Sequence, residues 1–446
     1  MARLFGTDGV RGEANVELLP ELAYRLGYAA TIYFGKRSED KPKILIGRDT
    51  RISGEMFEAA LTAGICSAGG RAVQVGILPT PAIAYLVKKI GAAAGVVISA
   101  SHNPFYDNGI KFFGGDGYKL PDAVEDEIEN ISKQIDTIQR PTGAKIGDVE
   151  RRHDLLNDYI DFVVSTTTER FDGMKIALDC ANGAAYEAMP AVLKKLGAEL
   201  ILIGDKPNGI NINDDCGSTH IQNLRLEVLR KKADIGIAHD GDADRCLCID
   251  EHGDLIDGDH ILIMCAKLMM NVGALKKNTV VTTVMANIGF REAMENLGGR
   301  YEITAVGDRY VLENMLSNGY NLGGEQSGHI IFTDYSTTGD GLITALQVLT
   351  AMKKSGKSAA ELNKMMTTFP QVLINIRVRD KEAYKSAEEV KRAIFEGETE
   401  LSTTGRILVR ASGTEPLIRV MAEGPNKQQL ERICNKIAAE IEKVSC

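Results

Sequence analysis

The chain has 446 residues, which is more than one hydrophobic core organises, and it predicts three or four domains of about 100–150 residues each. Its 52 basic and 61 acidic residues give a net charge of −9, which argues against nucleic acid as a partner. Neither a signal-peptide core nor a run of about 18 apolar residues is present, so we expect a cytoplasmic protein without a membrane partner.

A strand, a glycine turn, a helix, a glycine stop and a second strand recur three times along the chain. The paired apolar runs that mark these units are 44–47 with 72–76, 176–179 with 200–204, and 280–284 with 301–307. Such units form right-handed crossovers in parallel sheets. They predict an α/β protein with three related domains, each built on a mixed, largely parallel sheet.

The pattern changes after Pro370. Residues 372–378 alternate apolar with polar, further apolar runs occupy 407–409 and 417–422, and an amphipathic helix is expected over 428–444. This texture favours an antiparallel sheet covered by helices, a smaller α+β domain at the C-terminus. The predicted domains surround a central cleft and comprise residues 1–155, 156–255, 256–369 and 370–446.

The first segment with chemical character runs from Val96 to Pro104. A buried-strand pattern ends there in Ser-Ala-Ser-His-Asn-Pro, and the Asn-Pro step forces a turn and disfavours an immediate helix. The Ser101 hydroxyl displayed on that turn is a candidate nucleophile or phosphate carrier. An ordinary exit from a strand is the simpler alternative for this segment taken alone.

Three carboxylates follow in Asp240-Gly-Asp-Ala-Asp-Arg245, between the apolar runs 233–239 and 246–250. The small residues between them let the backbone curl, so that Asp240, Asp242 and Asp244 converge on one ion. Carboxylate oxygens suit Mg²⁺ or Ca²⁺ better than zinc. An EF-hand loop fits poorly, because Arg245 stands where that loop needs glycine and the flanks are strand-like.

Two later segments carry groups that suit a phosphorylated, hydroxylated ligand. Residues 323–329 place a carboxylate, a hydroxyl and an imidazole among glycines. Residues 410–416 combine a guanidinium, two hydroxyls and a glycine, with Arg419 in the strand beyond. An arginine fork with hydroxyl and backbone donors is suited to a phosphate dianion.

Together with Phe5-Gly-Thr-Asp-Gly-Val-Arg11-Gly12 at the start, these segments resemble the α-D-phosphohexomutase family, in the same order and over the whole chain. The resemblance implies a phosphoserine loop at 101–104, a metal loop at 240–245, a sugar loop at 325–329 and a phosphate loop at 410–416. Ser99 before Ser101, and Gln326 where mannose and glucose mutases usually carry Met, favour the branch that acts on glucosamine phosphates.

The resemblance also implies the reaction. The resting enzyme would carry a phosphate on Ser101, and Mg²⁺ would be held by Asp240, Asp242, Asp244 and a phosphoserine oxygen. Glucosamine 6-phosphate would receive the phosphoryl group and become glucosamine 1,6-bisphosphate. Ser101 would then take back the C6 phosphate and leave glucosamine 1-phosphate, which supplies UDP-N-acetylglucosamine synthesis for the cell wall.

Roles for the remaining residues follow from the same resemblance. Glu325 and Ser327 would grip ring hydroxyls, and His102 and Arg245 would complete the catalytic set. Lys111, Arg11 and His329 are candidates for proton transfer, although His329 has a competing role as a structural hydrogen bonder. The phosphate that is not reacting would be held by Arg410, Ser412, Gly413, Thr414 and Arg419.

Alternatives from other classes stay open at this point. A calcium-binding structural protein would use the aspartates but has no need of Ser101 or Arg410. An aspartyl phosphatase would use Asp240 as its nucleophile. A mutase for mannose or glucose phosphates would use the same machinery, and the assembly state is open, with a homodimer among the alternatives.

Overall fold

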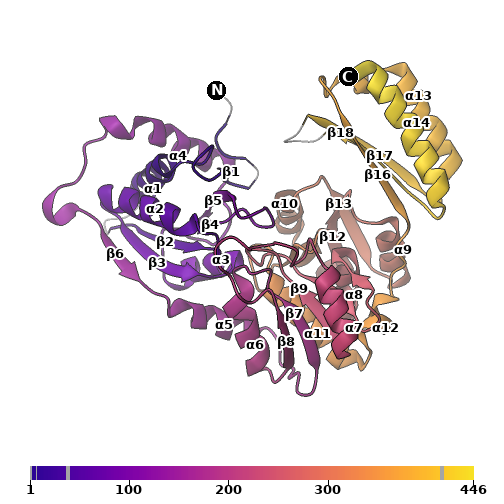
Figure 1. Ribbon diagram of the computed structural model, residues 1–446, viewed down its shortest axis with the longest axis horizontal. Helices are drawn as coiled ribbons and strands as arrows, with labels where there is room; N and C mark the ends of the chain where they lie inside the picture. Colours follow the sequence, from indigo (N-terminus) through magenta and orange to yellow (C-terminus); the bar gives the residue numbers. More distant parts are fainter. Residues whose placement is uncertain (1–2, 7, 37–40, 412–415, 446) are drawn as a thin grey trace. The chain divides into compact units, whose positions relative to one another are not determined.

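The computed structural model describes residues 3–6, 8–36, 41–411 and 416–445 (Figure 1). The chain forms two compact units. The first combines Met1–Met285 with Gly299–Met365, and the second combines Ala286–Gly298 with Met366–Cys446. Within the described ranges, no helix is both long and apolar enough to span a membrane.

The first sheet of the larger unit has six strands in the order β1-β5-β4-β2-β3-β6. Strand β2 lies parallel to β3 and β4, β3 lies parallel to β6, and β5 lies antiparallel to β4 and β1. The strands are β1 (Val10–Glu13), β2 (Lys43–Arg48), β3 (Arg71–Ile77), β4 (Ala94–Ile98), β5 (Asp107–Gly114) and β6 (Asp148–Arg151). Its helices are α1 (Pro20–Gly35), α2 (Gly54–Ser67), α3 (Thr80–Lys89) and α4 (Asp122–Gln134). The predicted parallel crossover over 44–76 is therefore confirmed.

The second sheet has five strands in the order β11-β10-β9-β7-β8. These strands are β7 (Lys175–Asp179), β8 (Glu199–Ile203), β9 (Ile235–Ala238), β10 (Leu247–Asp250) and β11 (Leu255–Ile256). Helices α5 (Leu155–Ser165), α6 (Ala185–Lys195) and α7 (Gln222–Lys231) accompany them. Strand β7 runs parallel to β8 and β9, whereas β10 and β11 return antiparallel, so the sheet is mixed as expected.

The third sheet has four strands in the order β13-β12-β14-β15. They are β12 (Thr279–Thr283), β13 (Arg300–Thr304), β14 (Leu322–Gly324) and β15 (Ile330–Phe332). The helices of this part of the larger unit are α8 (Gly258–Asn271), α10 (Asp308–Asn318), α11 (Gly341–Ser355) and α12 (Ala359–Asn363). Strand β12 is parallel to β13 and β14, which again matches the crossover that the sequence predicts.

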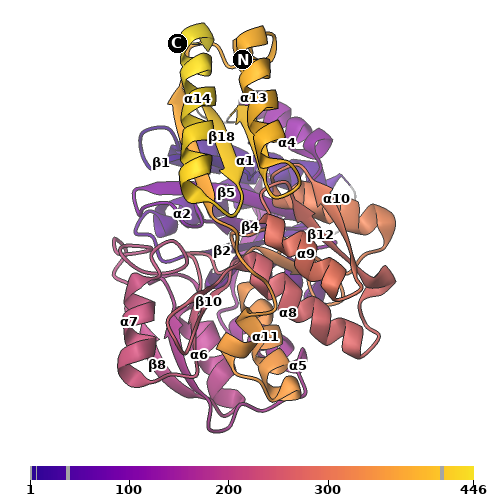
Figure 2. The ribbon, with the colours of Figure 1, turned by 90° about the vertical axis from the view of Figure 1, so that its right-hand side faces the viewer.

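The smaller unit has a different architecture. Its antiparallel sheet, in the order β16-β18-β17, consists of β16 (Gln371–Arg377), β17 (Arg406–Ala411) and β18 (Leu417–Glu423). Helices α13 (Glu388–Leu401) and α14 (Lys427–Ser445) run side by side along this sheet, and α9 (Ile288–Asn296) also belongs to the unit (Figure 2). Side chains of β18 and α14 form its core, which confirms the predicted α+β type.

The polar loops of the larger unit follow directly from buried strands. Strand β4 is buried at all five positions and leads to the Ser101 turn, while β9 is equally buried and leads to the Asp240 loop. Strand β14 ends just before Glu325. Ligands bind outside the carboxyl ends of strands in parallel α/β sheets, so this is where a site is expected.

Helices α1 and α2 pack closely because glycines stand at their contact. A Cβ atom on Gly64 would lie 2.1 Å from the carbonyl oxygen of Tyr24. Gly64→Ala should therefore force the helices apart and destabilise the protein by about 1–3 kcal/mol, as overpacking does. Thermal denaturation should show a lower Tm, whereas Ala63→Ser on the exposed side of α2 should change stability by less than about 0.5 kcal/mol. An unchanged Tm for Gly64→Ala would contradict this close packing.

Candidate active site

Asp240, Asp242 and Asp244 converge in the loop between β9 and β10. One carboxylate oxygen from each lies within 4.8 Å of the others, and all three residues are buried. Ala243 adopts a left-handed conformation with a φ of 58°, which bends the loop so that all three side chains meet. The convergence expected from the spacing of the aspartates is thus present.

The outer oxygens of this triad have partners. Asp240 Oδ2 accepts a hydrogen bond from Ser101 Oγ at 2.6 Å, and Asp240 Oδ1 accepts one from the Arg245 backbone N–H at 3.2 Å. Asp242 Oδ2 accepts from Thr80 Oγ1 at 2.8 Å and from Lys111 Nζ at 3.0 Å. These bonds fix the orientation of the Asp240 and Asp242 carboxylates.

Two oxygens of the triad are left over. Asp242 Oδ1 and Asp244 Oδ1 are buried and have no hydrogen-bond partner among the described residues. Buried acceptors of this kind are normally satisfied. A hard, oxygen-coordinated cation such as Mg²⁺ would satisfy both at once, so the residues present fit a divalent ion.

The pKa values of Asp240 and Asp244 are shifted in opposite directions. Burial, reinforced by the charges of Asp244 and Asp242, raises the pKa of Asp240 to about 8. Burial acts in the same direction on Asp244, but the nearby charges of His329, Lys111 and Arg245 prevail and lower its pKa. Near neutral pH, therefore, a proton on Asp240 takes the place of positive charge that a cation would supply.

Ser101 is presented to this triad in an unusual backbone conformation. Its φ is 53°, in the left-handed region that non-glycine residues rarely adopt, and only 2% of the residue is exposed. The His102 Nδ1 atom lies 3.3 Å from Ser101 Oγ. Burial and the positive charges of Arg245 and Arg11 lower the pKa of His102 to about 4, so its imidazole is neutral near pH 7.

A chain of alternating charges runs from the N-terminal segment towards the triad. Arg11 pairs with Asp8, whose Oδ1 lies 2.9 Å from Lys119 Nζ. The same ammonium lies 2.6 Å from Asp308 Oδ2 on α10. His329 continues the chain, because its imidazole lies 3.5 Å from a carboxylate oxygen of Asp308.

His329 ends the chain at the triad. Its Nδ1 atom lies 3.5 Å from Asp244 Oδ2. Burial opposes a charge on the imidazole, but Asp244 and Asp308 outweigh that effect and raise its pKa to about 9. The Gly339 backbone nitrogen lies 3.1 Å from Nε2, so the imidazole also packs against the chain that leads into α11.

A cavity of about 390 Å³ opens beside these residues within the larger unit. This volume is in the usual range for small-ligand sites. Glu325 faces it and accepts a hydrogen bond from the Gly307 backbone N–H at 3.1 Å. The residues that line it are Arg3, Asp8, Ser101, Asp122, Asp244, Arg245, Val306, Gly307, Asp308, Arg309, Tyr310, Glu325 and His329.

Ser327 and Gln326, the next polar residues of the predicted sugar loop, differ in their contacts. Ser327 Oγ is buried, has no hydrogen-bond partner among the described residues, and Ser327 is not among the residues that line the cavity. Gln326 instead donates to Asp257 Oδ2 at 3.2 Å, at the N-terminus of α8. The side chain that pointed to the hexosamine branch therefore holds the fold and does not line the cavity.

Sequence reasoning missed Asp8, Lys119 and Asp308, although all three carry charge into the cavity wall or its immediate support. Asp8 lies in the N-terminal segment that the family resemblance had already singled out. Asp308 follows Gly307 at the start of α10, where an acidic residue is also an ordinary feature of a helix N-terminus. Nothing in the local spacing of Lys119 marks it.

The predicted phosphate loop belongs to the smaller unit. Arg410 on β17 and Arg419 on β18 are direct cross-strand neighbours. Like charges opposed in this way are unfavourable, and burial together with Arg419 lowers the pKa of Arg410. No described residue forms an ion pair with Arg410. Ser412, Gly413 and Thr414 lie outside the described residues.

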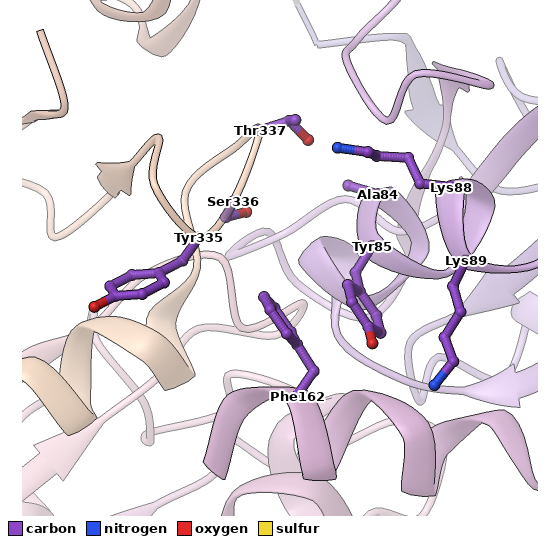
Figure 3. Close-up of a pocket in the computed structure, with 8 residues that line it drawn as sticks. All are labelled: Ala84, Tyr85, Lys88, Lys89, Phe162, Tyr335, Ser336 and Thr337. Atoms are coloured by element: carbon purple, nitrogen blue, oxygen red, sulfur yellow. The ribbon is translucent and has the colours of Figure 1, made fainter. Parts of the chain in front are cut away.

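A second hollow, of about 430 Å³, lies between α3, α5 and residues 335–337 (Figure 3). The rings of Tyr85 and Phe162 line it and stack on each other, with centroids 4.1 Å apart. Lys88 points towards Thr337 in Figure 3, and none of the predicted site residues lines this hollow. Its stacked rings have an evident structural role in joining α3 to α5.

Models of four domains of one family match nearly the whole chain. They describe phosphoglucomutase/phosphomannomutase α/β/α domain I at residues 2–139, domain II at 157–253, domain III at 257–369, and the C-terminal domain at 373–440. The chain belongs to the phosphoglucomutase/phosphomannomutase family. It is an isomerase-type phosphotransferase.

Curated relatives and solved structures of this family agree. Phosphoglucosamine mutase of Brevibacillus brevis is 54% identical over 439 residues, 98% of each chain, and that of Desulforamulus reducens is 53% identical over 98% of this chain and 99% of its own. A family protein from Burkholderia thailandensis has the same fold, with a TM-score of 0.80 at 22% identity, covering 99% of this chain and 97% of that one.

Another solved relative was determined with bound ligands. It is N-acetylphosphoglucosamine mutase of Aspergillus fumigatus in complex with GlcNAc-6P and magnesium. Its TM-score is 0.72 at 18% identity, covering 99% of this chain and 95% of that one. At this level of identity the likeness establishes the shared phosphohexomutase fold.

The two unpartnered oxygens of the triad generate a prediction about metal affinity. Asp244→Asn removes a charge that the ion needs, so calorimetry should show Mg²⁺ or Mn²⁺ binding weakened on the order of tenfold or more. Asp308→Asn, which removes a carboxylate from the same cavity but not from the triad, is the matched control. Equal affinity in Asp244→Asn and the unaltered protein would rule out this ligand set.

The same site should show a characteristic pH dependence. Asp240 must lose its proton to bind the ion, and its pKa is raised to about 8. Apparent metal affinity should therefore rise as the pH increases towards about 8 and level off above it, with proton release on binding. Calorimetry in buffers of different ionisation enthalpy measures that release. Affinity that is flat between pH 6 and 8, where a carboxyl with a pKa of about 8 is still losing its proton, would contradict the assignment.

Proposed function

We propose that the protein interconverts glucosamine 6-phosphate and glucosamine 1-phosphate, through a phosphate on Ser101 and glucosamine 1,6-bisphosphate. The observation that carries the proposal is the position of Ser101, whose Oγ lies 2.6 Å from Asp240 in a buried aspartate triad and lines the 390 Å³ cavity. The choice of an amino sugar is supported by the curated phosphoglucosamine mutases, which are 51–54% identical over nearly the whole chain.

We take Asp240, Asp242, Asp244 and an oxygen of phosphorylated Ser101 as the ligands of Mg²⁺. When bound, the ion supplies positive charge that offsets the negative charge of the transferred phosphoryl group. Phosphoryl transfer depends mainly on in-line positioning and on such neutralisation, so the protein needs to supply little covalent chemistry. Arg245 adds a second positive group, with Nε 4.0 Å from both Asp240 and Asp244.

In the first half-reaction the phosphorus–oxygen bond to Ser101 Oγ breaks, and a bond forms to the C1 hydroxyl oxygen of glucosamine 6-phosphate. The proton of that hydroxyl leaves, and Ser101 Oγ gains a proton. The product is glucosamine 1,6-bisphosphate. Glu325 and Ser327 would bind ring hydroxyls during this step, since Glu325 lines the cavity and Ser327 Oγ has no partner among the described residues.

In the second half-reaction the bisphosphate turns over, so that its C6 phosphate meets Ser101. The bond between phosphorus and the C6 oxygen breaks as a bond forms to Ser101 Oγ. The proton of the serine hydroxyl leaves, the C6 oxygen takes a proton, and glucosamine 1-phosphate is released. Arg410, Arg419 and the loop residues Ser412, Gly413 and Thr414 would hold the phosphate that is not reacting. The opposed arginines Arg410 and Arg419 support this role, because a dianion between them would relieve their mutual repulsion.

The basic groups around the serine have different roles in this proposal. His102 lies 3.3 Å from Ser101 Oγ, but a pKa of about 4 makes its imidazole a weak base, which favours a hydrogen-bonding role beside the serine over proton transfer. Lys111 is buried and charged beside Asp242, which favours an electrostatic role towards the phosphoryl group. Arg11 and His329 remain candidates for proton transfer at the sugar hydroxyl. In this proposal each of the four predicted domains, 1–155, 156–255, 256–369 and 370–446, would contribute one loop to the site.

The proposal predicts up to one phosphate per chain, located on Ser101. Peptide mass mapping of the purified protein should find it there, and Ser101→Ala should lose both the phosphate and turnover. Sugar-phosphate binding should survive in that variant, because the charged cavity wall remains. Stable phosphate only on Ser99 or on an aspartate would contradict the proposal and indicate that a residue other than Ser101 carries the phosphate.

Loss of the phosphate anchor should act on binding more than on chemistry. A charge-assisted bidentate contact is worth about 1.5–3 kcal/mol, so Arg410→Ala should raise KM roughly ten- to a hundredfold and let more bisphosphate escape. Arg410→Lys should rescue only in part, because it keeps the charge but loses the planar fork. Arg432→Ala, an exposed arginine on α14, is the control and should leave KM unchanged.

Substrate identity is tested separately, with the 6-phosphates of glucosamine, N-acetylglucosamine, glucose and mannose. The highest kcat/KM is expected for glucosamine 6-phosphate. A preference for mannose or glucose 6-phosphate would keep the family assignment and overturn the proposed substrate.

A further inference from the structure

The loop that carries Ser101 is held by two side chains from outside it. Arg51 Nη2 donates to the carbonyl oxygens of Ser101, at 3.2 Å, and of Asn103. Asn213 Nδ2 donates to the same two carbonyls, at 3.0 and 3.1 Å. Two donors thus grip both ends of the turn that contains His102.

Arg51 is itself fixed in place. It is 1% exposed, and its Nη1 atom pairs with Asp49, which is equally buried. Asp49 Oδ2 also accepts from Ser99 Oγ at 2.6 Å, and Ser99 Oγ in turn accepts the Ser101 backbone N–H at 2.9 Å. The amide and the carbonyl of Ser101 are therefore both tied to one buried ion pair.

Asn213 connects this arrangement to the metal loop. A Cβ atom on Gly241 would lie 2.5 Å from the Ser101 carbonyl oxygen and 2.9 Å from Asn213 Nδ2. The glycine between Asp240 and Asp242 thus lets the two loops approach until the serine carbonyl, the amide and the metal loop are in contact. Any rotation of the Ser101 peptide would break this contact.

We propose that Arg51 and Asn213 are positioning residues, which hold Ser101 in its left-handed conformation so that Oγ faces Asp240. Neither residue is among those that line the 390 Å³ cavity, so they act through Ser101 and not on the sugar phosphate. The inference rests on the proposed function, because it assumes that Ser101 carries the phosphate.

The geometry explains why such a clamp is needed. A serine with a φ of 53° is strained, and an unrestrained turn would relax to a right-handed or extended conformation. That change would swing Oγ away from Asp240 by rotating the backbone beneath it. Misplacement of a reacting atom by about 1 Å is enough to slow a reaction on the order of a hundredfold.

Asn213→Gly tests the clamp with little risk to folding. Asn213 has a φ of 58°, which glycine adopts without strain, so the substitution removes the two hydrogen bonds and leaves the backbone free to keep its path. Asp215→Gly is the matched control, because Asp215 is exposed in the same loop and has a φ of 49°. Arg51→Lys is the second variant, since it keeps the charge beside Asp49 but loses the fork.

Two readouts are needed. We expect Asn213→Gly to lower kcat roughly ten- to a hundredfold and to slow phosphorylation of Ser101 by glucose 1,6-bisphosphate by a similar factor, since one misplaced oxygen limits both. KM should stay within about twofold. Tm should fall further than in Asp215→Gly, because two buried hydrogen bonds are lost, but the protein should stay folded at the assay temperature. Arg51→Lys should show the same pattern, and the double variant should lose less than the product of the two effects.

Unaltered phosphorylation and kcat in a folded Asn213→Gly protein would overturn the inference, as would a loss confined to KM. If Arg51→Lys does not fold, Asn213→Gly decides alone. Failure of the unaltered protein to be phosphorylated on Ser101 would instead refute the proposed function, so the two failures are distinguishable.

Discussion

Three carboxylates buried beside one serine determine the electrostatics of the whole site. Removing charge from water is costly, and like charges a few ångströms apart repel strongly where the effective dielectric constant is low. Asp240, Asp242 and Asp244 are nevertheless all buried, with oxygens within 4.8 Å of one another. The positive and hydrogen-bond-donating groups around them offset this cost only in part. The remaining negative charge needs a cation or a proton.

The surrounding charges keep that balance across the cavity. Lys111 offsets Asp242 directly, while His329 joins the triad to Asp308 and, through Lys119, to Asp8 and Arg11. Because acids and bases alternate along this chain, each charge is screened by its neighbours and none is isolated. The cavity wall therefore has charges of both signs already in place, as a preorganised site for a phosphorylated ligand requires.

Part of this site is predictable from the sequence because it is local. The i, i+2, i+4 spacing of the aspartates and the strand before Ser101 are read directly, and the structure has both features. The strand–helix–strand repeats likewise predict three sheets correctly, since periodicity and glycine turns are short-range signals. The extra antiparallel strands β1, β5, β10 and β11 are less visible, because their partners are set by tertiary pairing.

The supporting residues are not predictable in this way. Arg51 lies 50 positions before Ser101 in the sequence, and Asn213 lies 112 positions after it. Nothing in the neighbourhood of Asn213 shows that its amide contacts a serine carbonyl in another sheet's loop. Gln326 shows the converse, because a residue that is informative in sequence turns out to hold Asp257. Local pattern identifies the candidate reactive groups, whereas long-range packing determines which side chains orient them.

The conformation of Ser101 shows why that orientation has to come from distant parts of the chain. A left-handed serine is unfavourable by local preference, and residues in such conformations persist only where the surrounding structure over-determines them. Here the amide is held through Ser99 and the carbonyl by Arg51 and Asn213, so the turn has little freedom left. The same contacts bring Gly241, and with it the aspartate loop, against the serine. The strained conformation of this one residue is thereby stabilised, and it fixes the distance between the serine oxygen and the carboxylates.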